Sequence, residues 1–140
     1  SSEEYFYDLL LPIGTNENGK KTKNKESVSI QSCINIHFMS ETMDGPNQYK
    51  CEQCQCRRDA NRSFELIELP SILSIQLSRY SFINGKKTKI RRAVDIDEKI
   101  EIPLKDGSSR EYILVALQHH LGGSADAGHY VAEFQPTYDG

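Results

Sequence analysis

The sequence has 140 residues, of which 37% are hydrophobic and 26% charged, with a formal net charge of −3. This length and balance suit one folded domain and exclude an intrinsically disordered chain. No apolar run approaches the roughly 20 residues that cross a bilayer, no signal-peptide pattern opens the chain, and the negative charge argues against nucleic acid. We therefore expect partners other than membranes and nucleic acids.

Three of the four cysteines are crowded into the segment Cys51–Cys56. A disulfide framework spreads its cysteines along the chain, whereas such clustering is typical of metal ligands or reduced thiols. The spacing therefore predicts an intracellular protein, in the cytoplasm, the nucleus or both.

The N-terminal half is expected to form a strand and one helix. The run Tyr5–Ile13 is rich in aromatic and aliphatic residues and predicts a strand, and the polar segment Asn16–Lys25 predicts a loop. From Val28 to Phe38, apolar residues recur at helical spacing, with Ser27 as the expected N-cap. A polar turn then leads into the cysteine cluster.

The second half predicts strands and turns. The extended segments, in chain order, are Arg62–Leu69, Ile72–Tyr80, Lys86–Arg92, Val94–Leu104, Tyr112–His120 and a strand that begins at His129. Asn84-Gly85 predicts a two-residue hairpin turn, Asp106-Gly107 another turn, and Gly122–Gly128 a flexible loop. One short helix among many strands indicates an antiparallel, β-dominated α+β domain.

The segment Lys86–Arg92 carries five basic residues. An exposed, charged strand edge explains it better than a nucleic-acid patch, because no aromatic residues are interleaved for base stacking. Arg79 and Tyr80, at the end of the preceding strand, are expected to pack on the sheet and to bond to their neighbours.

The triplet Gly128-His129-Tyr130 lies where the glycine-rich loop becomes the last strand. A residue without a Cβ lets another backbone approach closely, and histidine exchanges protons near neutral pH. On its own the triplet is compatible with a structural histidine at the end of a loop.

Five stretches in order carry a resemblance that covers nearly the whole chain: residues 4–11, Ser27–Phe38, Glu41–Ala60, Leu69–Tyr80 and Tyr112–Ala132. Together they resemble the C-terminal part of the catalytic domain of a ubiquitin-specific protease, a family of cysteine deubiquitinases. The resemblance implies that residues 1–140 are a partial catalytic domain, an antiparallel sheet palm with extended finger strands and one short helix, lacking the helical thumb. The implied partners are ubiquitin and ubiquitinated proteins.

In that family the histidine that His129 resembles takes a proton from a cysteine thiol and returns it to the leaving amine. The bonds cut are isopeptide or peptide bonds at the C-terminus of ubiquitin. By the same resemblance, a set of four residues borders the channel for ubiquitin's tail: His120, Gly122, Gly128 and Tyr130. A solvent-facing residue at a strand end is an equal alternative for His120, and His119 faces the opposite side.

The chain offers no cysteine in the setting that this family uses for its nucleophile, a Gly/Asn-rich start of a helix. Cys33 is expected in the core, and Asp139 is a poor candidate for the acid that orients His129. We therefore expect the chain alone to be inactive. The alternatives are a non-catalytic ubiquitin-binding or scaffold module and a zinc-dependent interaction module.

The pair Cys51 and Cys54 has the spacing of zinc ligands, but a structural zinc ion needs four ligands. Half of a zinc ribbon leaves two readings open, a structural zinc in the fingers or free thiols at a hairpin tip, and the second is favoured. No cofactor is expected to be required.

Overall fold

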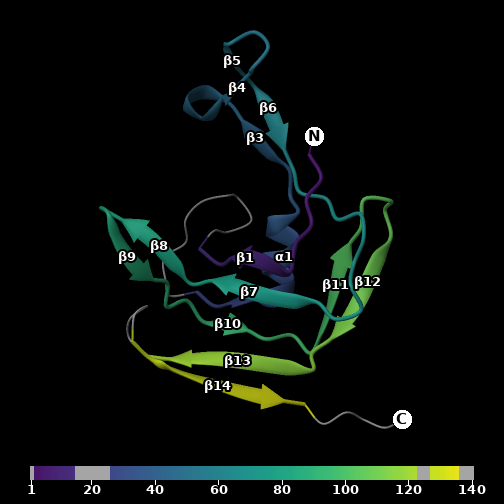
Figure 1. The fold of residues 1–140 in the computed structure, drawn as a ribbon, viewed down its shortest axis with the longest axis vertical. Helices are drawn as coiled ribbons and strands as arrows, with labels where there is room; N and C mark the ends of the chain where they lie inside the picture. Colours follow the sequence, from purple (N-terminus) through teal and green to yellow (C-terminus); the bar gives the residue numbers. More distant parts are fainter. Residues whose placement is uncertain (1, 15–25, 123–126, 136–140) are drawn as a thin grey trace.

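A computed structural model describes residues 2–14, 26–122 and 127–135. Within these ranges one α-helix and many short strands form a body from which a narrow, finger-like extension projects (Figure 1). The elements are β1 (Asp8–Pro12), β2 (Val28–Ser29), α1 (Ile30–His37), β3 (Glu41–Met43), the 3-10 helix η1 (Gly45–Asn47), β4 (Tyr49–Lys50), β5 (Arg57–Arg58), β6 (Ala60–Arg62), β7 (Ser74–Ser78), β8 (Tyr80–Ile83), β9 (Lys86–Lys89), β10 (Val94–Asp95), β11 (Lys99–Pro103), β12 (Ser109–Ile113), β13 (Ala116–Leu121) and β14 (His129–Phe134). The expected β-dominated α+β class is confirmed.

The strands pair two by two. Hairpin-like antiparallel pairs are β3–β6, β4–β5, β8–β9, β11–β12 and β13–β14. Two pairs, β1–β7 and β2–β10, are parallel and join segments far apart in the sequence. The strand pairs are therefore mostly antiparallel, as expected, while the two parallel pairs connect distant parts of the described chain.

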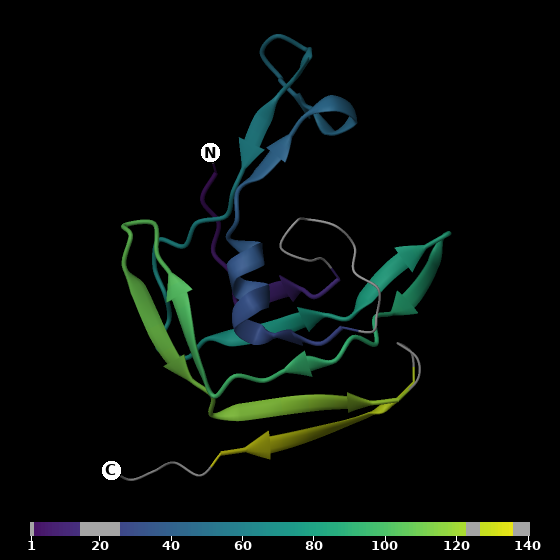
Figure 2. The same ribbon diagram turned by 180° about the vertical axis from the view of Figure 1, so that it is seen from behind.

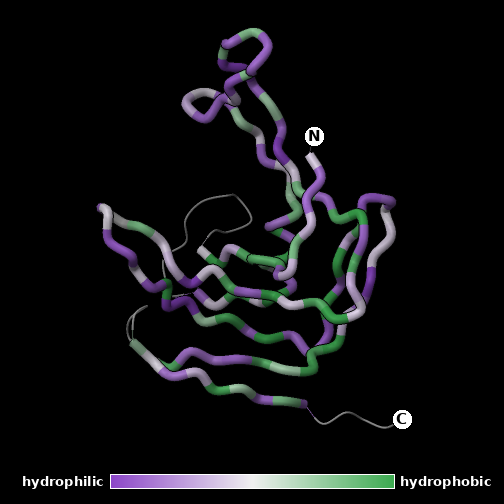
Figure 3. Tube along the Cα trace, in the orientation of Figure 1, coloured by the Kyte–Doolittle hydropathy of each residue, from purple (hydrophilic) through white to green (hydrophobic). Residues whose placement is uncertain are grey.

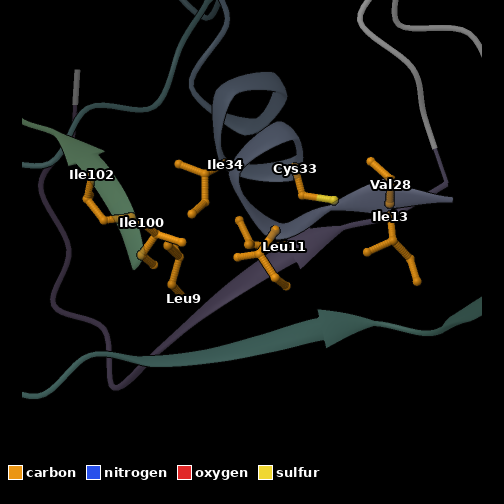
Figure 4. Packing of buried hydrophobic residues seen from close by; sticks show 9 residues of the cluster. Leu9, Leu11, Ile13, Val28, Cys33, Ile34, Ile100 and Ile102 are labelled. Atoms are coloured by element: carbon orange, nitrogen blue, oxygen red, sulfur yellow. The ribbon is translucent and has the colours of Figure 1, made fainter. Parts of the chain in front are cut away.

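The core forms where α1 lies against β1 and β11. Alternate residues of β1 and its extension, Leu9, Leu11 and Ile13, are buried, as the period-2 pattern of a half-buried strand requires. They pack with Val28 of β2, with Ile30, Cys33 and Ile34 of α1, and with Ile100 and Ile102 of β11. Figure 4 shows Leu11 and Leu9 between the helix residues Cys33 and Ile34 and the β11 residue Ile100. The expectation that Cys33 packs in the core is confirmed.

The start of the helix differs from the expectation. Ser29, not Ser27, is the N-cap: its side-chain oxygen accepts a hydrogen bond of 3.0 Å from the backbone N–H of Ser32. Val28 and Ser29 are held in an extended conformation because they pair with β10. A pairing across 66 residues thus moves the start of the helix by two residues, from Val28 to Ile30.

Two predicted strands differ from the expectation. Tyr5 and Tyr7 lie before β1 and are exposed, so the first strand is shorter than Tyr5–Ile13. The predicted strand Arg62–Leu69 was wrong, because β6 ends at Arg62 and residues 63–69 form no strand. The segment after β6 instead bonds to the β11–β12 hairpin: Leu66 accepts from the Lys105 N–H at 2.8 Å, and Leu69 accepts from the Arg110 guanidinium at 2.8 Å. These contacts replace a regular ladder.

Three longer predicted strands are each divided by the structure. Ile72–Tyr80 yields β7 and the first residue of β8, Val94–Leu104 yields β10 and β11, and Tyr112–His120 yields the end of β12 and most of β13. Each part pairs with a different partner, so one alternating sequence run serves two sheets. The predicted loop Asn16–Lys25 lies outside the described residues.

The turns follow their local chemistry. Asn84 and Gly85 have φ values of 51° and 75° and connect β8 to β9, as the Asn-Gly pair predicts. Gly107, with φ 86°, connects β11 to β12. Both turn predictions are confirmed.

The basic segment is only partly an exposed edge. Lys86 and Lys87 are exposed, and Figure 3 colours β9 as hydrophilic, but Arg92 is 5% exposed. Its guanidinium donates to the backbone carbonyls of Ile13 at 2.8 Å and Glu26 at 2.7 Å, so burial is compensated by hydrogen bonds. The expectation of a wholly exposed edge was wrong for Arg92. Arg79 also donates to backbone carbonyls, those of Ile90 and Arg92, as expected of a structural residue.

Candidate active site

The β13–β14 hairpin holds the candidate histidines. β13 and β14 pair antiparallel, with Leu121 opposite His129 and His120 opposite Tyr130. His129 is the first residue of β14 and is exposed. The strand pairing fixes its backbone, while its ring stays accessible from solvent, which is what a proton-transfer residue needs.

Three groups surround the half-buried ring of His120. The ring centroid of Tyr130 is 5.0 Å away with the planes tilted by 46°. The Lys89 Nζ atom lies 3.3 Å from the His120 Nδ1 atom. The His120 ring is thus half-buried and has contacts with both β14 and β9.

The third group is the backbone of Gly128. A Cβ placed on Gly128 would lie 2.1 Å from the His120 Nε2 atom and 2.7 Å from the Leu121 carbonyl oxygen. Any side chain at this position would overlap both. Gly128 is therefore required for the close packing of the His120 ring against the residue that precedes His129.

Gly122 is constrained at the other end of the loop. Its φ is 150°, and an added Cβ would lie 2.7 Å from the Ala127 carbonyl oxygen and 2.9 Å from the Gly128 Cα atom. Its own carbonyl accepts a hydrogen bond of 2.9 Å from the Lys89 ammonium. The two loop ends are thus in direct contact, and the residues between them, 123–126, lie outside the described structure.

The four predicted channel residues and His129 are therefore neighbours along one hairpin, and the alternation of side chains places His120 and Tyr130 on the opposite face from His129. The structure brings His120, Gly122, Gly128 and Tyr130 together within one hairpin, and their roles toward a substrate stay predictions. His119 points away from His120, to the face that it shares with His129, and its Nε2 atom is 3.5 Å from Glu133 Oε1, a distance that permits an ion pair but without hydrogen-bond alignment. Asp139 lies outside the described residues.

None of the four cysteines is near this hairpin. Cys33 is 1% exposed, and burial raises the pKa of its thiol, an effect that the charges of Arg92 and Arg79 partly offset. The other three lie at the tip of the finger-like extension, at the opposite end of the molecule from β13 and β14 (Figures 1 and 2). No thiol of this chain can therefore exchange a proton directly with His129.

The finger tip is built by the β4–β5 hairpin. The Cys51 N–H donates to the Cys56 carbonyl at 2.9 Å, and the Arg58 Nε–H donates to the Cys56 Sγ atom at 3.5 Å. The hydrogen bond from Arg58 is the main cause that lowers the pKa of the Cys56 thiol, and a contact with Cys54 adds to it. A cation beside the Cys56 sulfur thus favours its thiolate form.

The zinc interpretation of Cys51 and Cys54 stays a prediction. Among the described residues, no group of three or more His, Cys, Asp or Glu side chains is arranged to hold a metal ion. Cys51 and Cys54 thus lack the further ligands that a tetrahedral zinc site requires. The thiols of all four cysteines are free, without disulfides.

Sequence reasoning missed Lys89. It was treated as one of five similar basic residues, yet it is half-buried and contacts both His120 and Gly122. Its place at the end of β9, beyond the Asn84-Gly85 turn, gave no local sign of this contact. Only the packing of the β8–β9 hairpin beside β13 brings it there.

Taken together, the fold and the hairpin define a β-dominated domain that presents an accessible histidine at the end of a glycine-rich loop. The family model described as "Ubiquitin carboxyl-terminal hydrolase" matches residues 4–139. The chain belongs to this family, as a part of a ubiquitin-specific protease.

Curated relatives agree. The chain is 34% identical to "Ubiquitin carboxyl-terminal hydrolase 26" of Oryza sativa subsp. japonica, with 100% of the chain and 12% of that protein covered. It is also 34% identical to "Ubiquitin carboxyl-terminal hydrolase 48" of Rattus norvegicus, covering 96% of the chain and 12% of that protein. The chain thus spans about one eighth of the length of these relatives.

Solved structures share the fold. A structure of the yeast SAGA DUBm with a mutant Sgf73 aligns with a TM-score of 0.68 and 24% identity, over 91% of this chain and 27% of that one. The SAGA Ubp8/Sgf11/Sus1/Sgf73 DUB module bound to ubiquitin aldehyde aligns with a TM-score of 0.68 and 23% identity, over 95% of this chain and 29% of that one. No helix among the described residues is long and apolar enough to cross a membrane.

Proposed function

We propose that this chain is the histidine-bearing part of a cysteine deubiquitinase that hydrolyses isopeptide or peptide bonds at the C-terminus of ubiquitin. The observation that carries the proposal is His129: an exposed imidazole at the start of β14, within a segment that the family model matches. His129 acts as general base toward a thiol and then as general acid toward the leaving amine.

The nucleophile comes from a part of the protein beyond these 140 residues. This follows because Cys33 is buried in the core and Cys51, Cys54 and Cys56 lie at the finger tip, remote from His129. The chain by itself is therefore inactive in hydrolysis. The group that orients the His129 ring is likewise left to residues outside the described structure.

The substrate side of the site is the packed hairpin around His120. We assign Gly122, Gly128, His120 and Tyr130 to the channel that receives the extended C-terminal tail of ubiquitin. The support is their position: Gly122, Gly128 and Tyr130 are exposed and lie in or beside the hairpin that carries His129. The partners are ubiquitin and ubiquitinated proteins, and the protein acts inside the cell, in cytoplasm or nucleus, where exposed thiols such as Cys54 stay reduced. Hydrolysis needs no cofactor.

The test uses the full-length protein that contains this chain and a ubiquitin–fluorophore amide. His129→Ala is expected to lower kcat by at least about 10³-fold while the affinity for ubiquitin changes less than about 3-fold. His119→Ala, two residue pairs away from His129 on the same face of the hairpin, is the matched control and should retain activity. A His129→Ala enzyme that cleaves at the unmodified rate would refute the assignment, and a parent protein that binds ubiquitin without cleaving it would favour a non-catalytic ubiquitin-binding module.

A further inference from the structure

Lys89 joins three segments of the candidate site. Its Nζ atom lies 3.3 Å from His120 Nδ1 and donates a hydrogen bond of 2.9 Å to the Gly122 carbonyl. The two contacts span 31 and 33 positions of the sequence. One ammonium group thus connects β9 to the end of β13 and to the start of the loop that leads to His129.

The position of Lys89 is set by its backbone. Lys89 is paired with Tyr80 across the β8–β9 hairpin, and the next residue, Ile90, donates its N–H to the Arg79 carbonyl. Arg79 in turn donates to the carbonyls of Ile90 and Arg92. The base of the side chain is therefore anchored, and only the ammonium reaches across to the β13–β14 hairpin.

The contact with His120 has a chemical consequence. A lysine ammonium has three hydrogens and no lone pair, so it can only donate. The His120 Nδ1 atom must therefore accept, and the proton of the neutral ring is on Nε2. Nε2 is the atom that lies against Gly128, the residue before His129. Lys89 thereby determines which nitrogen of His120 presents a hydrogen to the loop.

We propose that Lys89 is a positioning residue of the deubiquitinase site: it fixes the tautomer and orientation of His120 and ties Gly122 to β9, so that the loop end before His129 is held for catalysis. This inference rests on the proposed function. Lys89 acts through His120 and the Gly122 carbonyl, and contributes no group to the reacting atoms.

The first experiment measures steady-state cleavage of a ubiquitin–fluorophore amide by the full-length protein. Lys89→Met keeps the aliphatic stem and removes the donor, and is expected to lower kcat about 10-fold with KM changed less than about 2-fold. Lys89→Arg keeps a cationic donor and should recover at least a third of the lost kcat. The matched control is Lys86→Met on the same strand, which is exposed and should leave kcat unchanged.

The second experiment separates positioning from a purely structural role. If Lys89 acts through His120, the loss caused by Lys89→Met should shrink to under about 3-fold in a His120→Gln background. Lys89→Gln serves the same comparison if the methionine variant melts at a lower temperature. Additive losses in the double variant, or a Lys89→Met enzyme within 2-fold of the unmodified kcat, would overturn the proposal.

These outcomes are distinct from failure of the proposed function. If His129→Ala abolishes cleavage and Lys89→Met leaves it intact, only the role of Lys89 is wrong. If His129→Ala has no effect, the active-site assignment itself is wrong, and the Lys89 proposal falls with it.

Discussion

The packing of Gly128 against His120 allows a strong test of the hairpin geometry. Replacing Gly128 with alanine adds one methyl group whose carbon would lie 2.1 Å from His120 Nε2 and 2.7 Å from the Leu121 carbonyl oxygen. To reach an ordinary contact, the methyl carbon and the ring nitrogen must separate by about 1.3 Å more, and the backbone contact also has to open. The ring and the loop end before His129 must both move.

The magnitude follows from two effects of this displacement. Overpacking of a tight contact costs about 1–3 kcal/mol of stability. A misplacement of about 1 Å near reacting groups can lower activity about 10²-fold. We therefore expect Gly128→Ala to lower kcat/KM about 10²-fold. The melting temperature should fall by only several degrees, because 1 kcal/mol corresponds to about 2–4 °C in a domain of roughly 150–250 residues.

Two glycines serve as controls in the same assay of the full-length protein. A Cβ on Gly14 would make an ordinary contact of 3.7 Å with Ile90 Cδ1, so Gly14→Ala should be nearly neutral in both readouts. Gly107 has φ 86° with no atom within 4 Å of an added Cβ, so Gly107→Ala should cost stability through backbone strain but leave kcat/KM unchanged. Retention of more than half of kcat/KM by Gly128→Ala would show that the hairpin is not packed as described.

Two further predictions concern stability. Leu11 is fully buried between α1 and the strands, so Leu11→Ala should lower the free energy of unfolding by about 2–5 kcal/mol in chemical denaturation. Leu10→Ala is the control, because the Leu10 side chain is 52% exposed and its loss should cost much less. Equal losses in the two variants would contradict the assigned core. Burial lowers the pKa of His37, whose ring stacks on Phe64 with centroids 5.0 Å apart. Because the pKa of His37 is lower in the folded protein, the unfolded chain binds a proton at a higher pH than the folded protein does. Burial of the neutral His37 ring is therefore compatible with full stability above the ordinary pKa of about 6.5, and stability is lost as the pH falls below that value. Denaturation midpoints at pH 7.5 and 5.5 should therefore differ less for His37→Gln than for the unmodified protein, and an unchanged difference would argue against this burial.

The local features of the fold were readable because their causes are local. Asn84-Gly85 tolerates positive φ at both positions, so the β8–β9 turn needed no tertiary information. The aromatic and aliphatic run that ends at Ile13 indicated the strand β1, although Leu9-Leu10-Leu11 did not show which of its faces is buried. The spacing of Ile30, Cys33 and Ile34 marked the buried face of α1.

Other features depended on residues far apart in the sequence. Ser27 and Ser29 are equally good capping residues by type, and the choice fell to Ser29 because residue 28 and residue 29 pair with β10. The alternating pattern of Ile72–Tyr80 is the same whether the strand pairs in parallel or antiparallel, and β1 is its parallel partner. Arg92 resembles its basic neighbours in sequence, yet backbone carbonyls of Ile13 and Glu26 bury it.

The sequence by itself determined the strand-rich class, the tight turns and an accessible histidine after a glycine-rich loop, since each follows from the chemistry of adjacent residues. Only the tertiary structure decided that Lys89 reaches His120 and Gly122, that the His120 ring lies against Gly128, and that every cysteine is remote from His129. The physical reason is that these contacts join separate hairpins, and the free energy that selects them comes from packing between elements rather than from the conformational preferences within any one of them.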